Sequence, residues 1–293
     1  MRGISSRTFR YFRVIKGLVP VLLFAFLVAC NEDGSNAVTQ PEADESSSSE
    51  SSLLSNSSSS AVLDESEVSS SSSASETVVA PSTVIKGTMT DSRDGHTYKT
   101  VTIGTQTWMA ENLNFETANS FCYNDSLENC AIYGRLYTWG AAMDSAAVWS
   151  TDGKDCGYKK NCSTYPPALK MRGICPEGWL LPDEWAWKQL YKAIGRDRYA
   201  AADILKSASG WRDDGNGTDV YSFAMLPSGI WVEGADSSYS EFESLGAKAY
   251  FWLPSAQSLY VAGLVMVQAQ SPRMFTNFVS KNSALAVRCI KAQ

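Results

Sequence analysis

Cysteine offers the most chemistry in this chain of 293 residues, which carries seven cysteines and one histidine. Six cysteines follow residue 120, and they are Cys122, Cys130, Cys156, Cys162, Cys175 and Cys289. An even number of cysteines in an exported chain is typical of disulfides, and six allow 15 pairings. The simplest pairing has two short bridges, Cys122–Cys130 and Cys156–Cys162, and one long closure, Cys175–Cys289. Zinc is not expected, because there is no Cys-x2-Cys pair and only one histidine.

Nucleophilic catalysis would have to use His96, the one histidine of the chain. Ser-His-Asp and Cys-His systems both need an imidazole as the base. No Gly-x-Ser-x-Gly motif accompanies His96, and the cysteines are expected to be oxidised. We therefore interpret His96 as a residue on the surface of a strand.

Paired carboxylates, which act as acid and base in glycosidases, occur at three places. The pairs are Asp183/Glu184, Asp213/Asp214 and Glu241/Glu243. Each lies in an expected turn or at a helix start, where acidic residues are ordinary. The sequence therefore predicts a protein that is not an enzyme.

Calcium is the one metal that the sequence brings into question. The loop from residue 213 to residue 219 offers hard oxygen ligands on Asp213, Asp214, Asn216 and Asp219. The spacing is not that of an EF-hand, and a tight Gly/Asn turn explains the same residues. We expect no cofactor and no metal, with calcium in this loop as the alternative.

The N-terminus carries five basic residues and no acidic ones in residues 1–29, and a 12-residue apolar run from Leu18 to Ala29. A membrane-spanning helix needs about 20 residues, so residues 1–29 are interpreted as a signal peptide. Leu27-Val28-Ala29-Cys30 resembles the bacterial lipobox. The resemblance implies cleavage before Cys30, lipidation of that cysteine and a stable membrane anchor. The alternative is an ordinary secretory signal with a chance cysteine. We expect an exported protein anchored by lipid in the cell envelope, first of all in the outer membrane, where it could be surface-exposed.

Residues 30–86 are predicted to be the lipid anchor and a disordered linker. Twenty of the residues 31–83 are serine, and residues 31–86 carry ten acidic side chains and one basic one. Such a segment cannot bury enough apolar surface to fold. Removal of the signal peptide changes the net charge from −6 to about −11, which argues against nucleic acid as a partner.

The folded domain is predicted over residues 87–293, which is long enough for one sizeable core. Residues 87–95 are expected to be a turn-rich opening. Alternating side chains of high β-propensity on both sides of a Gly104-Thr105 turn then predict a hairpin over residues 96–110. The spacing of Leu136, Trp139, Ala142 and Met143 predicts a first helix over 131–147, followed by an irregular loop over 150–172. A second helix should begin at Pro182-Asp183-Glu184 and end at Gly195. A short helical turn is expected over 200–208, with strands and turns from Trp211 onward.

Ordered blocks of this domain resemble the Fibrobacter succinogenes major paralogous domain. The blocks are Asp91–Asn114, Cys122–Trp139, Gly173–Pro182, Gly215–Asp219 with Leu226-Pro227, and Ala249–Trp252 with Val287–Cys289. The resemblance spans residues 87–291. It implies an α+β, C-type-lectin-like fold with antiparallel sheets, two main helices, long loops and neighbouring termini. That fold is similar to formylglycine-generating domains, which bind copper with a cysteine pair. Here the fold would pair Cys289 with Cys175, so we expect no such activity, and the family implies no other.

Aromatic residues supply the candidate ligand contacts. Ten lie between residues 211 and 260, and most are expected in the core. Exposed Trp and Tyr in loops can bind sugars or proteins. We predict Trp231 and Tyr239 as such contacts, because they lie in Gly229–Glu243, the stretch least similar to the family.

These observations predict a lipid-anchored envelope protein with a non-catalytic domain that binds a polysaccharide or a partner protein. One alternative is a structural or assembly component of the envelope that binds no sugar. Another is a carbohydrate-modifying enzyme, against which the missing catalytic residues argue.

Overall fold

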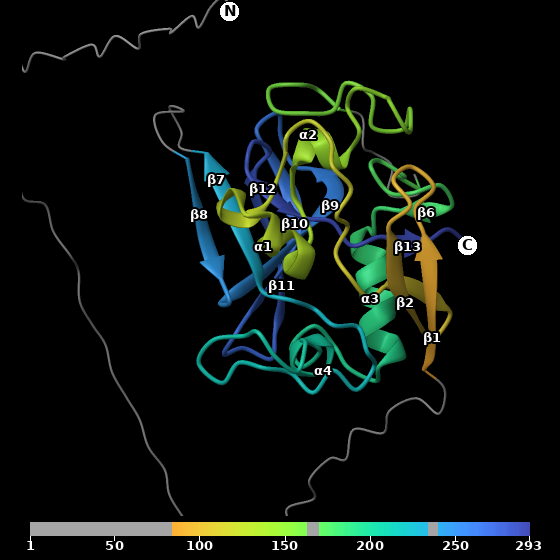
Figure 1. Cartoon of the computed structure of the whole chain (residues 1–293), viewed down its shortest axis with the longest axis vertical. Helices are drawn as coiled ribbons and strands as arrows, with labels where there is room; N and C mark the ends of the chain where they lie inside the picture. The colour runs from red at the N-terminus through yellow and green to blue at the C-terminus, as the bar shows by residue number, and fades with distance from the viewer. Residues whose placement is uncertain (1–83, 163–169, 234–239) are drawn as a thin grey trace, which may run out of the picture. The chain divides into compact units, whose positions relative to one another are not determined.

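The computed structural model describes residues 84–162, 170–233 and 240–293, which form an α+β domain (Figure 1). The predicted signal peptide, Cys30 and the serine-rich linker up to residue 83 lie outside the described residues. The elements begin at Ile85, close to the expected start of the domain.

One sheet has five strands in the order β1-β2-β3-β13-β6, and all its pairs are antiparallel. Its strands are β1 Ile85–Thr90, β2 Thr97–Ile103, β3 Gln106–Met109, β6 Trp179–Leu180 and β13 Ile290–Lys291. The predicted hairpin is confirmed as β2 and β3. The predicted turn-rich opening is wrong in part, since β1 pairs along its whole length with β2. The turn is confined to the Asp91–His96 segment, where Gly95 has a φ of +76°.

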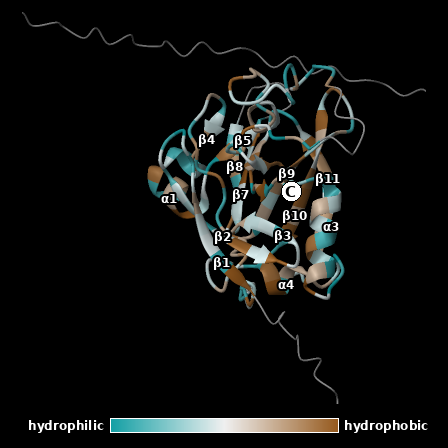
Figure 2. Cartoon of the chain, turned by 90° about the vertical axis from the view of Figure 1, so that its right-hand side faces the viewer, coloured by the Kyte–Doolittle hydropathy of each residue, from teal (hydrophilic) through white to brown (hydrophobic). Residues whose placement is uncertain are grey.

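A second sheet contains eight strands, six of them in the order β11-β10-β9-β12-β5-β4. Off this path, β7 pairs with both β12 and β8. The strands are β4 Ser120–Phe121, β5 Leu136–Thr138, β7 Ser228–Glu233, β8 Ser240–Leu245, β9 Lys248–Ala256, β10 Val261–Gln268, β11 Met274–Ser280 and β12 Ala284–Ala286. The sheet is mixed, because β12 runs parallel to β9 and antiparallel to its other partners. The strands β9 and β10 are mostly buried and largely brown in Figure 2.

The predicted first helix over 131–147 is wrong. The structure has a 3-10 turn over Tyr123–Asp125, helix α1 over Leu127–Tyr133, strand β5, and then the short helix α2 over Trp139–Ala142. Gly134 ends α1 with a φ of +75°, where a Cβ atom would lie 2.9 Å from the carbonyl oxygen of Leu113. Residues 136–138 then pair with β12. Strand pairing over a long sequence distance thus overrides the helical spacing.

The predicted second helix is confirmed as α3, Glu184–Ala193, and the short helical turn as α4, Ala202–Leu205. Asp183 caps α3 by accepting a hydrogen bond from the amide of Ala186 at 2.7 Å. The helix lies between the two sheets. The ring of Trp187 lies 4.9 Å from that of Trp108 on β3 and 5.6 Å from that of Phe251 on β9, between ring centroids. Packing through Trp187 therefore joins the two sheets.

All three predicted disulfides are confirmed. The Cα–Cα distances are 4.9 Å for Cys122–Cys130, 4.7 Å for Cys156–Cys162 and 6.0 Å for Cys175–Cys289. The last bridge spans 114 positions and joins the segment before β6 to the residue before β13. It fastens the C-terminal end of the domain to its middle.

Candidate functional site

A groove opens where β4, β5, β7 and the connection between β11 and β12 meet. Strand β12 positions these elements, because its residue Ala284 is paired with Trp231 of β7 on one side and with Thr138 of β5 on the other. The cavity has a volume of about 360 Å³. Its wall includes Phe121, Tyr158, Trp231, Glu233, Lys281 and Asn282, and we call it the Trp231 groove.

Two stacked rings form the aromatic wall of the Trp231 groove. The rings of Trp231 and Phe121 lie 4.7 Å apart between centroids, with an interplanar angle of 18°. Trp231 is half-buried, so Phe121 holds it in place while part of the side chain faces the groove. The expectation that Trp231 is exposed in a loop is wrong, since it is half-buried on strand β7 and packs against the core. It lines the cavity, and its role in binding stays a prediction. The other predicted contact, Tyr239, lies outside the described residues.

Hydrogen-bonding groups line the same groove as the aromatic wall, and one of them, Glu233, lies two residues after Trp231 on β7. The Nδ2 atom of Asn282 donates to Oε2 of Glu233 at 2.6 Å. Both residues are half-buried and line the groove. The pair leaves the other carboxylate oxygen and the amide oxygen as acceptors for hydroxyl donors.

Lys281 is the residue of this site that sequence reasoning missed. Its backbone is held on both sides, because its N–H donates to the oxygen of Tyr260 at 2.8 Å and its oxygen accepts from Trp139 at 3.1 Å. The residue is only 1% exposed. Its Nζ lies 4.4 Å from the centroid of the Trp139 ring. Within the described part of the chain, Nζ has no hydrogen-bond partner. Burial lowers the pKa of Lys281.

In the loop predicted as a calcium site, side-chain oxygens of Asn216 and Asp219 accept hydrogen bonds from nearby backbone amides. The side-chain oxygen of Asn216 accepts from the amide of Trp211 at 3.0 Å, and Oδ1 of Asp219 accepts from the amide of Ala224 at 2.8 Å. Burial raises the pKa of Asp219 against the opposing effect of that hydrogen bond. Asp213 and Asp214 both adopt a positive φ in the turn. Over residues 84–162, 170–233 and 240–293, no group of three or more His, Cys, Asp or Glu side chains is placed to hold a metal ion.

The other residues considered for chemistry are dispersed. His96 is exposed just before β2, with its ring centroid 4.5 Å from that of Tyr98. Asp183 is the cap of α3, as expected for an acid at a helix start. Glu241 and Glu243 are exposed on strand β8, so their expected position in a turn is wrong. None of these four residues lines the Trp231 groove.

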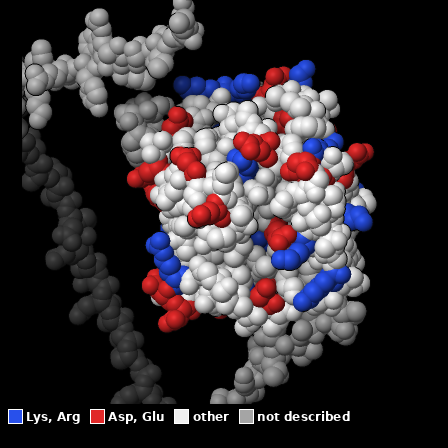
Figure 3. Space-filling view, in the orientation of Figure 1, with Lys and Arg blue, Asp and Glu red and all other residues white. Residues whose placement is uncertain are grey.

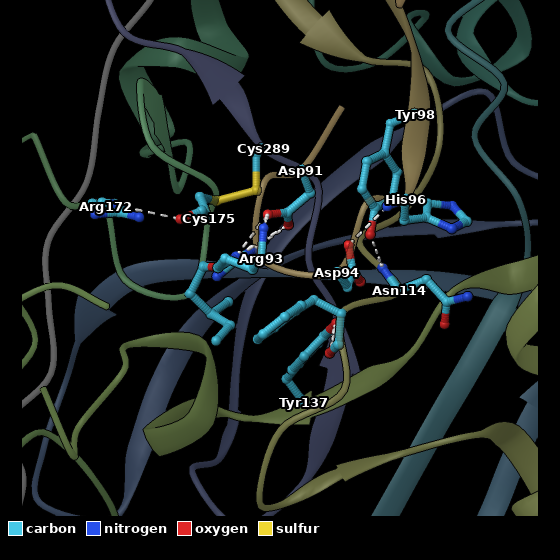
Figure 4. A network of polar contacts seen from close by, with 12 residues as sticks. Asp91, Arg93, Asp94, His96, Tyr98, Asn114, Tyr137, Arg172, Cys175 and Cys289 are labelled. Carbon is cyan, nitrogen blue, oxygen red and sulfur yellow. Dashed lines mark hydrogen bonds and ion pairs between the residues drawn. A yellow bond between two sulfur atoms is a disulfide. The ribbon is translucent and has the colours of Figure 1, made fainter. Parts of the chain in front are cut away.

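A buried polar network fixes the start of the domain to the long disulfide (Figure 4). Arg93 and Asp91 form an ion pair of 2.6 Å, and their side chains are 6% and 0% exposed. Arg93 also donates to the oxygen of Ile174 at 2.8 Å, next to Cys175, and lies 3.9 Å from the ring centroid of Phe115. Burial alone would raise the pKa of Asp91, but the hydrogen bonds and charge of Arg93 lower it. We assign this network to stability.

The charged surface shows no large field of one sign on the face seen in Figure 3, where acidic and basic side chains alternate. Among the helices of the described residues, none is both long and apolar enough to span a bilayer.

Comparison with curated proteins and with solved structures finds no match for this chain. A family model does match, and its description is Fibrobacter succinogenes major domain. The match runs from residue 101 to residue 291, which includes β3, all the helices, the three disulfides and the Trp231 groove. The chain belongs to the Fibrobacter succinogenes major domain family.

Proposed function

We propose that this protein is a non-catalytic binding protein of the cell envelope whose domain holds a saccharide in the Trp231 groove. The observation that carries the proposal is the pairing of a rigid aromatic wall with a polar wall in one cavity. Trp231 is stacked on Phe121, and the hydrogen-bonded pair of Asn282 and Glu233 lines the same cavity. Sugar rings present both apolar C–H faces and hydroxyl groups, so they need both kinds of wall.

The size and rigidity of the groove favour this ligand class. A volume of about 360 Å³ is at the lower end of the range for small-molecule sites, which is about 300–1,000 Å³. The loop bearing Tyr158 is tied by the Cys156–Cys162 disulfide, and β7 is tied to β12 and β8. Pre-positioned walls reduce the entropy lost on binding.

The proposed setting is an exported protein anchored through lipid on Cys30, with the serine-rich linker as a spacer. The three disulfides are consistent with an oxidising compartment. For the domain we propose a C-type-lectin-like fold. Its support is the α+β architecture, together with β1 and β13, from opposite ends of the domain, in one five-stranded sheet. The acidic mature chain supports a partner other than nucleic acid.

A protein partner is the second candidate, and a different surface favours it. Trp185 on α3 is 62% exposed beside a cavity of about 440 Å³ that Leu180, Leu181 and Pro182 also line. An exposed Trp beside apolar side chains is a common centre of protein interfaces. This surface would serve an assembly component of the envelope that binds no sugar.

The test is a glycan-array and insoluble-polysaccharide binding assay with the full chain, its disulfides intact. We expect Trp231→Ala to weaken binding at least tenfold, because loss of a central aromatic contact costs about 2 kcal/mol or more. Asn282→Ala should weaken binding without disturbing the Trp231–Phe121 stack. Trp185→Ala is the matched control, since it removes an exposed Trp outside the groove. Binding to no glycan by the folded protein, or equal losses for the Trp231 and Trp185 variants, would refute the proposal.

A further inference from the structure

We infer that the saccharide bound by the Trp231 groove is acidic, and that its anionic group pairs with the ammonium of Lys281. This inference rests on the proposed function and adds the chemical class of the ligand. It starts from the position of Lys281, which lines the groove, is 1% exposed and has no hydrogen-bond partner for Nζ in the described part of the chain.

The other strongly buried cations of the described residues all have polar partners. Arg93 pairs with Asp91, and Arg135 pairs with Glu116 at 2.7 Å. Lys206 lies 3.0 Å from a carboxylate oxygen of Asp203 and donates to the oxygen of Ala269 at 2.8 Å.

Arg288 follows the same rule without a direct ion pair. Its guanidinium donates to Oδ1 of Asn112 at 2.6 and 3.0 Å and to the backbone oxygen of Ala224 at 3.2 Å. Buried charge is costly unless it is paired or hydrogen-bonded, and the described part of this domain gives a buried cation polar partners at four sites. Lys281 is the exception, and it is also the buried cation that lines the groove.

Nothing else in the described part of the protein fills the role of the missing anion. The nearby acid is Glu233, whose Oε2 is bonded to Asn282, and it makes no salt bridge with Lys281. Among the described residues, Nζ has no hydrogen-bond partner and lies over the face of the Trp139 ring, 4.4 Å from its centroid. A ring face attracts a cation but accepts none of its three hydrogen bonds in a directed way. The ammonium of Lys281 therefore lies against the Trp139 ring, and its three N–H groups donate no hydrogen bond within the described structure.

A carboxylate or sulfate on the ligand would complete the site. The backbone of residue 281 is fixed by its bonds to Tyr260 and Trp139, whereas the four-carbon side chain is a flexible arm with a charged end. When an anion enters the groove, we expect the ammonium to turn from the Trp139 ring toward it. A charge-assisted hydrogen bond then replaces the cation–π contact. A neutral sugar would leave the ammonium where it is.

The experiment compares acidic and neutral forms of the same sugar backbone, for two backbones, by isothermal titration calorimetry on the full chain. The probes are oligogalacturonate and its methyl ester, and then carboxymethyl-dextran, dextran sulfate and dextran. The variants are Lys281→Met, Lys281→Arg and Trp231→Ala. Lys154→Met, an exposed lysine outside the groove, is the control for surface charge. Carboxymethyl-dextran and dextran sulfate carry carboxylate and sulfate groups on the same backbone, so their comparison shows which of the two anions the groove binds.

We expect at least one acidic probe to bind ten times more tightly than its neutral form. Lys281→Met should remove that difference, Lys281→Arg should retain part of it, and Lys154→Met should leave it within twofold. Unchanged thermal unfolding of each variant, or a higher midpoint, shows that the fold is intact.

Three results would overturn the inference, and they differ in what they say of the groove. If acidic and neutral forms bind equally and Trp231→Ala abolishes both, the groove binds sugar but Lys281 selects no anion. If Lys154→Met weakens acidic binding as much as Lys281→Met does, the attraction is general surface charge. If no probe binds, or if Trp231→Ala has no effect on any probe, both the inference and the proposed function fail.

Discussion

Replacement of Lys281 by methionine should stabilise the folded protein, although it removes a residue from the core of the groove. Methionine has nearly the same length and no polar end. The variant therefore keeps the packing against Trp139 and removes the ammonium that has no hydrogen-bond partner in the described structure. Most point substitutions do the opposite and destabilise by about 1 kcal/mol.

The magnitude follows from three contributions. A buried donor without a partner costs about 1–3 kcal/mol, and a charged one lies toward the upper end. Against this, loss of the cation–π contact at 4.4 Å removes up to about 2 kcal/mol of stabilisation. A thioether over the same ring restores about 0.3–1.5 kcal/mol. With a cost near 3 kcal/mol, the balance is a gain of about 1–2.5 kcal/mol in the free energy of unfolding, and each 1 kcal/mol corresponds to about 2–4 °C in the melting temperature of a domain of this size.

The pH dependence provides a second, independent signature. Burial lowers the pKa of Lys281 below its ordinary value of 10.5, so the unfolded chain binds more protons than the folded one between the two pKa values. The cost is complete below the folded pKa and disappears as the pH rises toward 10.5. The advantage of Lys281→Met should therefore shrink over that interval. The buried tyrosines titrate in both proteins and cancel in the difference.

Urea unfolding of wild type, Lys281→Met and the exposed control Lys154→Met, at several pH values from 6 to 10, measures these quantities. The control should stay within about 0.5 kcal/mol of wild type. A loss of 1 kcal/mol or more for Lys281→Met would mean that Nζ has a stabilising partner in the folded protein. A gain that does not change with pH would mean that packing, and not the charge, is responsible.

Two further predictions concern the parts that hold the domain together. Asp91→Asn should cost about 3–5 kcal/mol in urea unfolding, because it leaves the guanidinium of Arg93 buried without its counter-ion. Since the pKa of Asp91 is lowered in the fold, this contribution is present above pH 3.8 and is lost as the pH falls through the folded pKa. A loss below 1 kcal/mol would contradict it. Removal of the Cys175–Cys289 bridge by paired serine substitutions should cost about 4–5 kcal/mol, against about 2.5 for Cys122–Cys130, because the loops span 114 and 8 positions. Equal losses would refute the loop-entropy argument.

The features that sequence reasoning predicted correctly are the ones that short-range chemistry determines. The amphipathic spacing and the Asp183 cap located α3, and alternation with a turn located β2 and β3. The disulfides followed from the even count and from the nearness in sequence of four of the six cysteines. Each of these predictions needed information from a window of only a few residues, or from a count.

The predicted helix over 131–147 failed for the opposite reason. Leu136, Trp139 and Met143 are all buried, so the apolar pattern was interpreted correctly as core and wrongly as one helix. Pairing of β5 with β12, about 150 positions later, decides the backbone conformation there. A helical period in the sequence cannot report a partner at that distance, because either conformation can bury the same side chains.

The candidate site illustrates the same limit and also shows how a structure goes beyond it. Trp231 could be singled out from its residue type, whereas Lys281 looks like an ordinary lysine after the strand β11. Its burial becomes visible only in the fold, where β12 pairs with both β5 and β7 and Lys281 is almost fully shielded from solvent. A fold that satisfies Arg93, Arg135, Lys206 and Arg288 has the means to pair a buried cation. We therefore propose that Lys281, a buried cation with no hydrogen-bond partner among the described residues, is paired by a ligand that enters the cavity, since sequences are otherwise consistent with their folds except where function requires a departure.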